Sequence, residues 1–368
     1  GKNTMKNNRT FLEKLLDGVE VQYEKLSDVL PIKRGKRVVR NELDENGIYP
    51  VYQNSLQPLG YFNNKNCEAY TTFIIAAGAA GEIGFSEVEF WAADDCYYFE
   101  CPKEVLNNKF LYYVLMAQKH NLLKKVRKAS IPRLGKDTIE KLSIPIPPLS
   151  VQTEIVQILD TLTALTSELT SELILRRKQY EYYREKLLSF DSLERLNEGG
   201  GKKKLIDVVK IKNGKDWKHL GEGDIPIYGS GGIMGYVDTY SYDKPTVLIP
   251  RKGSITNIFY LEEPFWNVDT IYYTEIDTTQ ILPKYFYHFM KTVDLTKLDT
   301  GSGRPSLTQA ILNEIPIFVP SIEEQHRIVS ILDKFETLTN SITEGLPLAI
   351  EQSQNRYEYY RELLLNFS

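Results

Sequence analysis

The sequence predicts an α+β protein built as an internal repeat, in which two similar globular blocks are each followed by a long helix. The first observation is a repeated helical segment, because residues 179–190 (QYEYYREKLLSF) recur at 356–367 as RYEYYRELLLNF. The second is a repeated helix start, because residues 152–160 (QTEIVQILD) recur at 325–333 as QHRIVSILD. Self-similarity of this kind indicates one structural unit present twice.

The third observation is that the blocks upstream of these helices also align. Residues 60–115 match residues 235–290 without a gap, and the identical pairs include Gly60/Gly235, Tyr61/Tyr236, Gly78/Gly253, Trp91/Trp266, Asp94/Asp269 and Tyr98/Tyr273. We therefore divide the chain into an N-terminal segment 1–19, block 1 (20–148), a central helical segment 149–198, block 2 (199–318) and a C-terminal helical segment 319–368.

Each block has the pattern of a compact α+β domain. Short runs rich in β-branched and aromatic residues are separated by glycine turns, and each block then has one helical run. The predicted strands lie within 70–77, 88–100, 246–250, 258–266 and 270–276, and the helical runs are 107–118 and 283–293.

The two helical segments carry an apolar seam with spacings of three and four residues, which predicts that they pack on each other. A proline cluster at 145–148 stops the first helix from extending backwards, and residues 344–347 (EGLP) should kink or break the second. The second seam also includes Leu338 and Ile342. The principal seam residues are Ile155, Leu159, Leu162, Leu169, Leu173, Tyr180, Tyr183, Leu187, Ile328, Leu332, Phe335, Tyr357, Tyr360 and Leu364.

Composition favours a globular chain of a reducing compartment. The chain is 42% hydrophobic and 26% charged, with a net charge of −4, and no apolar run is long enough to span a membrane. Residues 1–19 lack the apolar core of a secretory leader. Three cysteines without a CxxC pair predict neither a disulfide framework nor structural zinc, so we expect a cytoplasmic protein. The histidines are scattered in sequence, and no metal site is predicted.

Basic residues cluster within the blocks, which is the electrostatic footprint of a DNA-binding protein. From Lys119 to Lys136, both included, the chain has seven basic residues and no acidic one. The predicted DNA contacts combine cations for phosphates with polar residues of glycine-rich loops for base edges. They are Lys33, Arg34, Lys36, Arg37, Gln53, Asn54, Lys124, Lys125, Lys128, Arg133, Lys212, Lys215, Ser230, Arg251, Lys252 and Arg304.

Catalytic motifs are absent from the sequence. The glycine clusters 78–84 and 229–235 do not fit a dinucleotide-binding fingerprint, and there is no phosphate-binding loop. The Asn-Pro-Pro-aromatic motif of an adenine methyltransferase is missing, and no carboxylate–lysine group indicates a nuclease. We therefore predict no catalytic residue, no bound cofactor and no metal ligand.

Two variable blocks alternating with two similar helices resemble the specificity subunit of a type I restriction–modification system. The resemblance rests on the block starts at 27–36 and 206–215, with their shared I-x-x-G-K, and on the block exits at 144–152 and 315–325. It extends over the whole chain.

The resemblance implies that each block is a target recognition domain that reads one half of a split sequence on double-stranded DNA. It implies an antiparallel helix pair that sets the spacer and docks two methyltransferase subunits, with motor–endonuclease subunits added. S-adenosylmethionine and ATP would then bind those partners, and this chain would have no catalytic centre.

Three alternatives remain open at this stage. One is the specificity subunit of a type II system whose partner fuses methylation and cleavage. Another is a catalytic DNA methyltransferase or nuclease, and the third is a scaffold that uses its helices for assembly without touching DNA.

Overall fold

The computed structural model describes residues 11–196 and 200–367, so the first ten residues of the predicted N-terminal segment lie outside the described residues. The same holds for residues 197 and 198 of the central segment, the first residue of block 2 and the last residue of the chain. The chain forms two compact units. Unit 1 comprises Gly1–Glu168 and Ile350–Ser368, and unit 2 comprises Leu169–Ala349.

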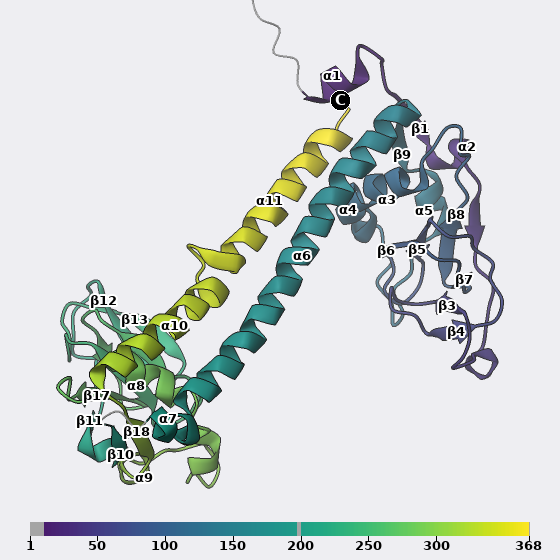
Figure 1. Cartoon of the computed structure of the whole chain (residues 1–368). Helices are drawn as coiled ribbons and strands as arrows, with labels where there is room; N and C mark the ends of the chain where they lie inside the picture. The colour runs from purple at the N-terminus through teal and green to yellow at the C-terminus, as the bar shows by residue number, and fades with distance from the viewer. Residues whose placement is uncertain (1–10, 197–199, 368) are drawn as a thin grey trace, which may run out of the picture. The chain divides into compact units, whose positions relative to one another are not determined.

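Block 1 lies in unit 1 and is built on three antiparallel or mixed sheets (Figure 1). A four-stranded sheet has the order β2-β8-β5-β6, a three-stranded sheet β4-β3-β7, and β1 pairs with β9 where the chain enters and leaves the block. The strands are β1 (Gln22–Lys25), β2 (Ile32–Arg34), β3 (Tyr49–Tyr52), β4 (Gly60–Phe62), β5 (Thr71–Ile75), β6 (Ile83–Ser86), β7 (Trp91–Ala92), β8 (Cys96–Phe99) and β9 (Ser143–Ile146).

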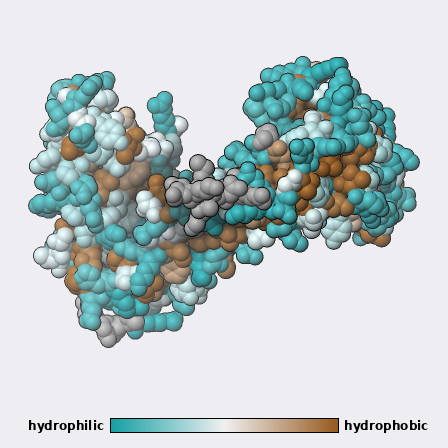
Figure 2. Space-filling view, turned by 90° about the horizontal axis from the view of Figure 1, so that it is seen from above, coloured by the Kyte–Doolittle hydropathy of each residue, from teal (hydrophilic) through white to brown (hydrophobic). Residues whose placement is uncertain are grey.

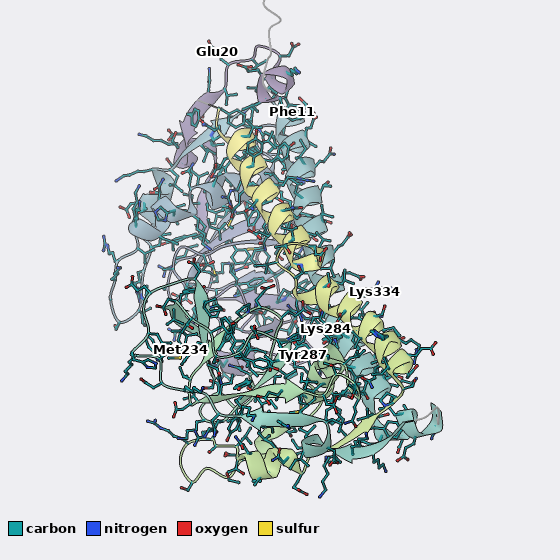
Figure 3. All side chains as sticks on the ribbon, turned by 90° about the vertical axis from the view of Figure 1, so that its left-hand side faces the viewer. Phe11, Glu20, Met234, Lys284, Tyr287 and Lys334 are labelled. Atoms are coloured by element: carbon teal, nitrogen blue, oxygen red, sulfur yellow. The ribbon has the colours of Figure 1, made fainter. Side chains whose placement is uncertain are left out.

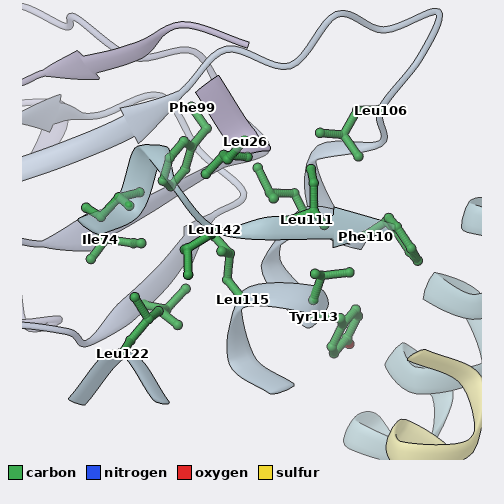
Figure 4. Packing of buried hydrophobic residues seen from close by; sticks show 14 of the residues in the cluster. Leu26, Ile74, Phe99, Leu106, Phe110, Leu111, Tyr113, Leu115, Leu122 and Leu142 are labelled. Atoms are coloured by element: carbon green, nitrogen blue, oxygen red, sulfur yellow. The ribbon is translucent and has the colours of Figure 1, made fainter. Parts of the chain in front are cut away.

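Block 1 and the segment before it also contain short helices. They are α1 (Phe11–Leu16), α2 (Leu26–Val29), the 3-10 turn η1 (Arg40–Glu42), α3 (Asn108–Ala117), α4 (Lys119–Lys124) and α5 (Lys136–Glu140). Figure 4 shows apolar side chains from α2, β5, β8 and α3 gathered in one core, among them Leu26, Ile74, Phe99 and Phe110. Burial of these groups supplies the main driving force for folding the block.

Block 2 repeats this plan in unit 2. The sheet orders are β11-β17-β14-β15, β13-β12-β16 and β10-β18. The strands are β10 (Gly201–Lys204), β11 (Val209–Lys212), β12 (Ile225–Gly229), β13 (Gly232–Val237), β14 (Thr246–Pro250), β15 (Phe259–Leu261), β16 (Trp266–Asn267), β17 (Ile271–Ile276) and β18 (Pro316–Val319). The shorter helical elements are α7 (Phe190–Leu196), η2 (Leu205–Asp207), α8 (Pro283–Met290), η3 (Leu295–Leu298) and α9 (Gln309–Asn313).

The repeat and the predicted α+β class are therefore confirmed. The predicted helical runs are α3 and α8, and each packs beside its four-stranded sheet. The predicted strands 70–77, 246–250 and 270–276 coincide with β5, β14 and β17. The run 88–100 divides into β7 and β8, and the run 258–266 divides into β15 and the start of β16.

The long helices follow the two blocks. Helix α6 (Leu149–Leu188) begins directly after the proline cluster and is 40 residues long, which corresponds to about 60 Å at 1.5 Å per residue. The second helical segment consists of α10 (Ile322–Asn340) and α11 (Gly345–Leu365).

The predicted interruption of the second helix is present, at residues 341–344. Gly345 has φ +82°, and a Cβ there would lie 2.6 Å from the carbonyl oxygen of Thr337, so glycine allows the chain to turn against the end of α10. Pro347 then falls in the first turn of α11, where a proline costs no helical hydrogen bond. Ile342 was wrongly included in the seam, because it lies in this interruption and is 78% exposed.

In unit 1, α11 packs antiparallel on the first half of α6. Ile155 and Leu159 are fully buried in one cluster with Leu364, and Tyr357 and Tyr360 pack against that cluster. Further along, the Thr166 and Ser353 hydroxyls are 2.8 Å apart. Leu162 is half-buried.

In unit 2, α10 packs antiparallel on the second half of α6. Ile328 and Leu332 are buried, and the ring of Tyr180 stacks on Phe335 at 6.3 Å. Tyr183 also stacks on Phe335, at 5.6 Å, but it is 41% exposed and thus lies at the margin of the seam. The remaining seam residues of this unit, Leu169, Leu173 and Leu187, are half-buried.

Candidate nucleic-acid interface

In block 1, three segments that are distant in sequence meet at one end of the four-stranded sheet. In the turn after β5, the Gly78 N–H donates a hydrogen bond to the Pro132 carbonyl at 3.2 Å, and the Ala79 N–H donates one to the Asn54 carbonyl at 2.9 Å. Ala77 also forms a β-bridge with Arg133. A Cβ on Gly78 would lie 2.7 Å from Asn54 Cβ, so the glycine is required for this close approach.

In block 2 the equivalent segments meet in the same way. Gly253 N–H donates to the Pro305 carbonyl at 3.1 Å, and Lys252 forms a β-bridge with Ser306. The hydroxyl of Ser230 lies 3.1 Å from the position of a Cβ on Gly253. The sheet end of each block thus gathers predicted DNA contacts: Asn54 with Arg133 in block 1, and Ser230 with Lys252 and Arg304 in block 2.

We call these two surfaces the basic ends. The basic end of block 1 comprises Arg34, Lys36, Arg37, Gln53, Asn54, Lys124, Lys125, Arg127, Lys128 and Arg133. The basic end of block 2 comprises Lys215, Ser230, Arg251, Lys252 and Arg304. All of these side chains are exposed except Gln53, Ser230 and Arg251, which are half-buried.

The basic run between Lys119 and Lys136 is divided by its ion pairs. Lys119 binds Glu82 at 2.7 Å and Lys136 binds Glu140 at 3.1 Å. The other five cations form no ion pair within residues 11–196 and 200–367: Lys124, Lys125, Arg127, Lys128 and Arg133. Unpaired cations are the ones available to phosphate groups.

Arg127 was not among the predicted DNA contacts, but it lies beside one of them. Its N–H donates to the Arg133 carbonyl at 2.9 Å, and the Arg133 N–H donates back at 3.2 Å. This backbone bridge places the two arginines opposite each other. The signal was available, since Arg127 belongs to the basic run, but nothing in the sequence distinguished it from its neighbours.

A cavity of about 490 Å³ opens at the basic end of block 1. Its walls include Arg34, Arg127 and Arg133 together with Asp95 and Asp137. Arg34 is oriented by a hydrogen bond from its Nε to the Asp94 carbonyl at 2.8 Å. Arginine forks with fixed orientation suit phosphate oxygens and the acceptor edge of guanine.

Lys33 and Lys212 differ from the other predicted contacts, because each lies close to a glutamate: Glu100 directly after β8, and Glu275 on β17. Lys33 Nζ lies 2.6 Å from Glu100, and the hydrogen bond to this carboxylate raises the pKa of Lys33. Lys212 Nζ lies 3.7 Å from Glu275. These glutamates neutralise much of the charge that the sequence pattern assigned to DNA.

The shared I-x-x-G-K motif has a backbone function in both blocks. A Cβ on Gly35 would lie 2.0 Å from the Ala93 carbonyl oxygen, and one on Gly214 would lie equally close to that of Val268. The Trp91 indole N–H donates to the Lys36 carbonyl at 2.8 Å, and Trp266 donates to the Lys215 carbonyl at 3.3 Å. The motif therefore packs a loop onto the sheet and leaves the lysine side chains exposed.

A buried glutamine attaches each block to the helix that follows it. Gln152 Oε1 accepts from Asn107 N–H at 2.8 Å, and its Nε2 donates to the carbonyls of Val105 and Pro147. Gln325 makes the matching bonds to Leu282 N–H, Gln280 and Pro320. Both side chains belong to residues with no exposed surface.

A carboxylate eight residues later makes a second attachment. In unit 1, Asp160 binds Lys109 at 3.0 Å and accepts a hydrogen bond from the Tyr113 hydroxyl. In unit 2, Asp333 binds Lys284 at 2.8 Å and the buried His288 Nε2 at 2.8 Å. Asp160 and Asp333 are the last residues of the repeated sequences 152–160 and 325–333. The repeat therefore marked these two carboxylates, but the sequence did not show which residues they bind.

His288, Asp333 and Glu336 are close enough to hold a metal ion, with potential ligand atoms all within 4.8 Å of one another. The two carboxylates already have partners, since Asp333 binds Lys284 and Glu336 accepts from the Tyr287 hydroxyl at 2.8 Å. An ammonium group beside the site opposes a second cation. The cluster therefore fits a polar contact between α8 and α10 better than a metal site.

Figure 2 shows hydrophobic side chains gathered in patches within a largely hydrophilic surface. Within the described ranges, no helix is both long and apolar enough to cross a membrane. The three cysteines are free, as the sequence predicted.

Comparison with protein families gives two matches to one family model, described as the type I restriction modification DNA specificity domain, at residues 18–176 and 197–352. A putative type I restriction enzyme specificity subunit of Haemophilus influenzae is 43% identical over 99% of this chain and 100% of its own length. The EcoR124I/EcoR124II specificity subunit of Escherichia coli is 32% identical over 97% of each chain.

Solved structures show the same fold. The crystal structure of a type I restriction–modification S subunit from M. genitalium matches with a TM-score of 0.65 and 22% identity, over 95% of this chain and 96% of that one. A chain from a study of complex assembly and conformational transition in the type I R-M system matches with a TM-score of 0.59 and 13% identity, over 94% of this chain and 98% of that one.

Proposed function

The chain belongs to the family of type I restriction–modification DNA specificity subunits, and we propose that its two basic ends are the surfaces that read DNA. Each end would contact one half of a bipartite site. The observation that carries this assignment is the same convergence in both blocks, where loops distant in sequence meet around Gly78 and around Gly253.

The basic ends suit a division between positioning and reading. Lys124, Lys125 and Lys128 are exposed on a helix end and the loop after it, where long side chains can reach phosphates. Asn54, Arg133, Ser230 and Arg304 lie around the glycine turns, where the backbone can approach base edges closely. Arginine and asparagine are the side chains best suited to guanine and adenine, respectively.

We further propose that the paired helices dock two methyltransferase subunits of the complex. A groove of about 770 Å³ lies on the helix pair of unit 1, lined in part by Phe11, Leu162 and Tyr359. Tyr182, the repeat equivalent of Tyr359, is 57% exposed in unit 2. Two copies of one surface favour two copies of one partner.

The remaining components follow from this assignment. S-adenosylmethionine and ATP would bind the methyltransferase and motor–endonuclease subunits, while this chain contributes no catalytic group. The complex would act on double-stranded DNA in the cytoplasm.

Block exchange tests the proposal. Block 1 is replaced by the equivalent block of another specificity subunit, and the methylated motif of the reconstituted complex is determined by single-molecule sequencing. We expect a change in one half of the motif only, and the reciprocal exchange of block 2 should change the other half. A chimera in which both halves change would contradict independent reading, and methylation by the purified chain alone would contradict its non-catalytic role.

A further inference from the structure

We propose that Ile233 and Met234, at the tip of the β12–β13 hairpin, read thymine in the half-site of block 2 by contacting its C5-methyl group. The inference rests on the proposed DNA-reading function of the basic ends and adds a specificity determinant to one of them. Ile233 is 53% exposed and Met234 is 57% exposed, although both are large apolar side chains.

A β-bulge shapes this tip. Tyr228 pairs with Ile233 and Ile227 pairs with Gly235, so Met234 is an extra residue without a partner in the ladder. Gly232, at the start of β13, has φ +110°, which favours glycine at this turn. Bulges re-aim side chains and are frequent near functional sites. Here the bulge accompanies the exposure of two adjacent apolar residues.

The tip lies beside the cations of the same block. A Cβ on Gly229 would lie 2.6 Å from Met234 Sδ and 3.3 Å from Thr270 Oγ1, so the sulfur and the threonine flank one glycine. The Thr270 carbonyl accepts from Arg251 N–H at 2.9 Å and from Lys252 N–H at 3.2 Å. Figure 3 shows Met234 at the margin of unit 2.

Charge and chemistry together select DNA as the occupant. An apolar tip next to Arg251 and Lys252 will be drawn towards a polyanion. The thymine methyl is the apolar group that base pairs present in the major groove, and side chains recognise it by apolar contact. The exposed apolar atoms then have a specific partner in the half-site.

Block 1 lacks an equivalent tip. Leu59 is the counterpart of Met234 in the repeat, and it packs against a cluster of Val38, Val51 and Ala93. Pro58 precedes it, in place of Ile233. Thymine reading of this kind is therefore assigned to block 2 alone.

The test uses the complex of this chain with its methyltransferase subunits and a duplex carrying its own motif. After block exchange has assigned the half-site of block 2, each thymine in that half is replaced singly by deoxyuracil, which removes only the methyl group. We expect about a fourfold weaker binding at one thymine or more, as for the loss of one buried methyl. The doubly substituted chain Ile233→Ala/Met234→Ala should bind the thymine and deoxyuracil duplexes equally.

Ile206→Ala is the matched control, because Ile206 is 55% exposed and lies in η2, beside β11 of the four-stranded sheet and not on the β12–β13 hairpin. It should keep the full sensitivity to deoxyuracil, and thermal melting should show that all variants fold.

Three outcomes would overturn the inference: a half-site without thymine, a wild-type complex indifferent to every deoxyuracil, or a double variant that retains the sensitivity. The variant Arg251→Ala/Lys252→Ala separates this failure from that of the proposed function. If it weakens binding on all sequences while deoxyuracil has no effect, block 2 binds DNA but does not read methyl groups. If it leaves binding unchanged, the basic end of block 2 is not a DNA surface.

Discussion

Block 1 and block 2 share their attachments to the helices and differ at their basic ends. Both have a buried glutamine at the start of the following helix, a carboxylate that binds a lysine on α3 or α8, and a tryptophan that holds the G-K loop. At the basic ends, block 1 has five cations between residues 124 and 133 that pair with no carboxylate of the described residues, whereas block 2 has an apolar hairpin tip beside fewer cations.

The frame and the proposed DNA-reading surface can therefore vary independently. The frame bonds lie at the sheet–helix junction and involve buried groups, where a change leaves a polar atom unsatisfied. The basic ends consist mostly of exposed side chains, many of them on loops, where substitutions have little effect on folding. One fold can therefore present different chemistry to each half-site.

The largest expected effect tests the shared frame. Gln152→Ala removes three hydrogen bonds and leaves the Asn107 N–H buried without its partner, so we expect a loss of about 3 kcal/mol in the free energy of unfolding. Gln325→Ala should destabilise to a similar extent. Urea denaturation measures both, with Gln354→Ala as an exposed control on α11. Losses below about 1 kcal/mol in either variant would show that the glutamines do not hold the frame.

The next prediction concerns the pH dependence of the stability that Asp333 contributes to the attachment of block 2. Burial opposes ionisation of Asp333, but hydrogen bonds from His288 and Lys284 outweigh it and lower the pKa of this carboxyl. The stabilisation is present above the unfolded-state pKa of about 3.9 and is lost as pH falls through the lower folded-state value.

Asp333→Asn should therefore remove part of the acid dependence of stability below about pH 4. Urea midpoints from pH 3 to pH 7 would show the wild type losing more stability than the variant as the pH falls. Parallel curves would contradict this assignment.

Tyr113→His tests whether the histidine of block 2 can serve in block 1, with near wild-type stability at neutral pH as the expected result.

A smaller effect is expected at the basic end of block 1. Lys124→Ala with Lys125→Ala should weaken binding similarly on all DNA sequences and reduce the slope of log K against log salt concentration by about 1.8. Lys136→Ala is the matched control, because Lys136 is already paired with Glu140. Fluorescence anisotropy at several salt concentrations measures the slope, and an unchanged slope in the double variant would remove α4 from the interface.

The smallest effect on either block is expected from the helix between them. Residues 166–173 repeat the sequence TSEL in α6, and a third copy after Leu173 would add about 6 Å and 40° to the helix. Because no residue of either block changes, both half-sites should stay the same while the gap between them widens by one or two base pairs. Sequencing of the methylated motif decides this, and an unchanged gap in an active complex would show that α6 does not set the separation.

The repeat, the fold class and the helix interruption could all be predicted from the sequence. These features are local or periodic: apolar residues at three- and four-residue spacing specify a helix face, and proline and glycine limit the backbone wherever they occur. Gly345 and Pro347 therefore predicted the interruption, and no information about their neighbours in space was needed. The seam pattern was wrong at Ile342, inside that interruption, and Tyr183 lies only at the margin of the seam.

Which candidate residues lie close together depends on the tertiary structure. The segments of Asn54 and Arg133 lie near each other only because the turn after β5 forms backbone hydrogen bonds with both of them. The pairing of Lys33 with Glu100, the opposition of Arg127 and Arg133, and the His288–Asp333 contact likewise join residues from different elements. Such contacts depend on strand register and helix packing, which bring distant residues together, whereas the periodicity of one segment specifies only which of its own faces is buried.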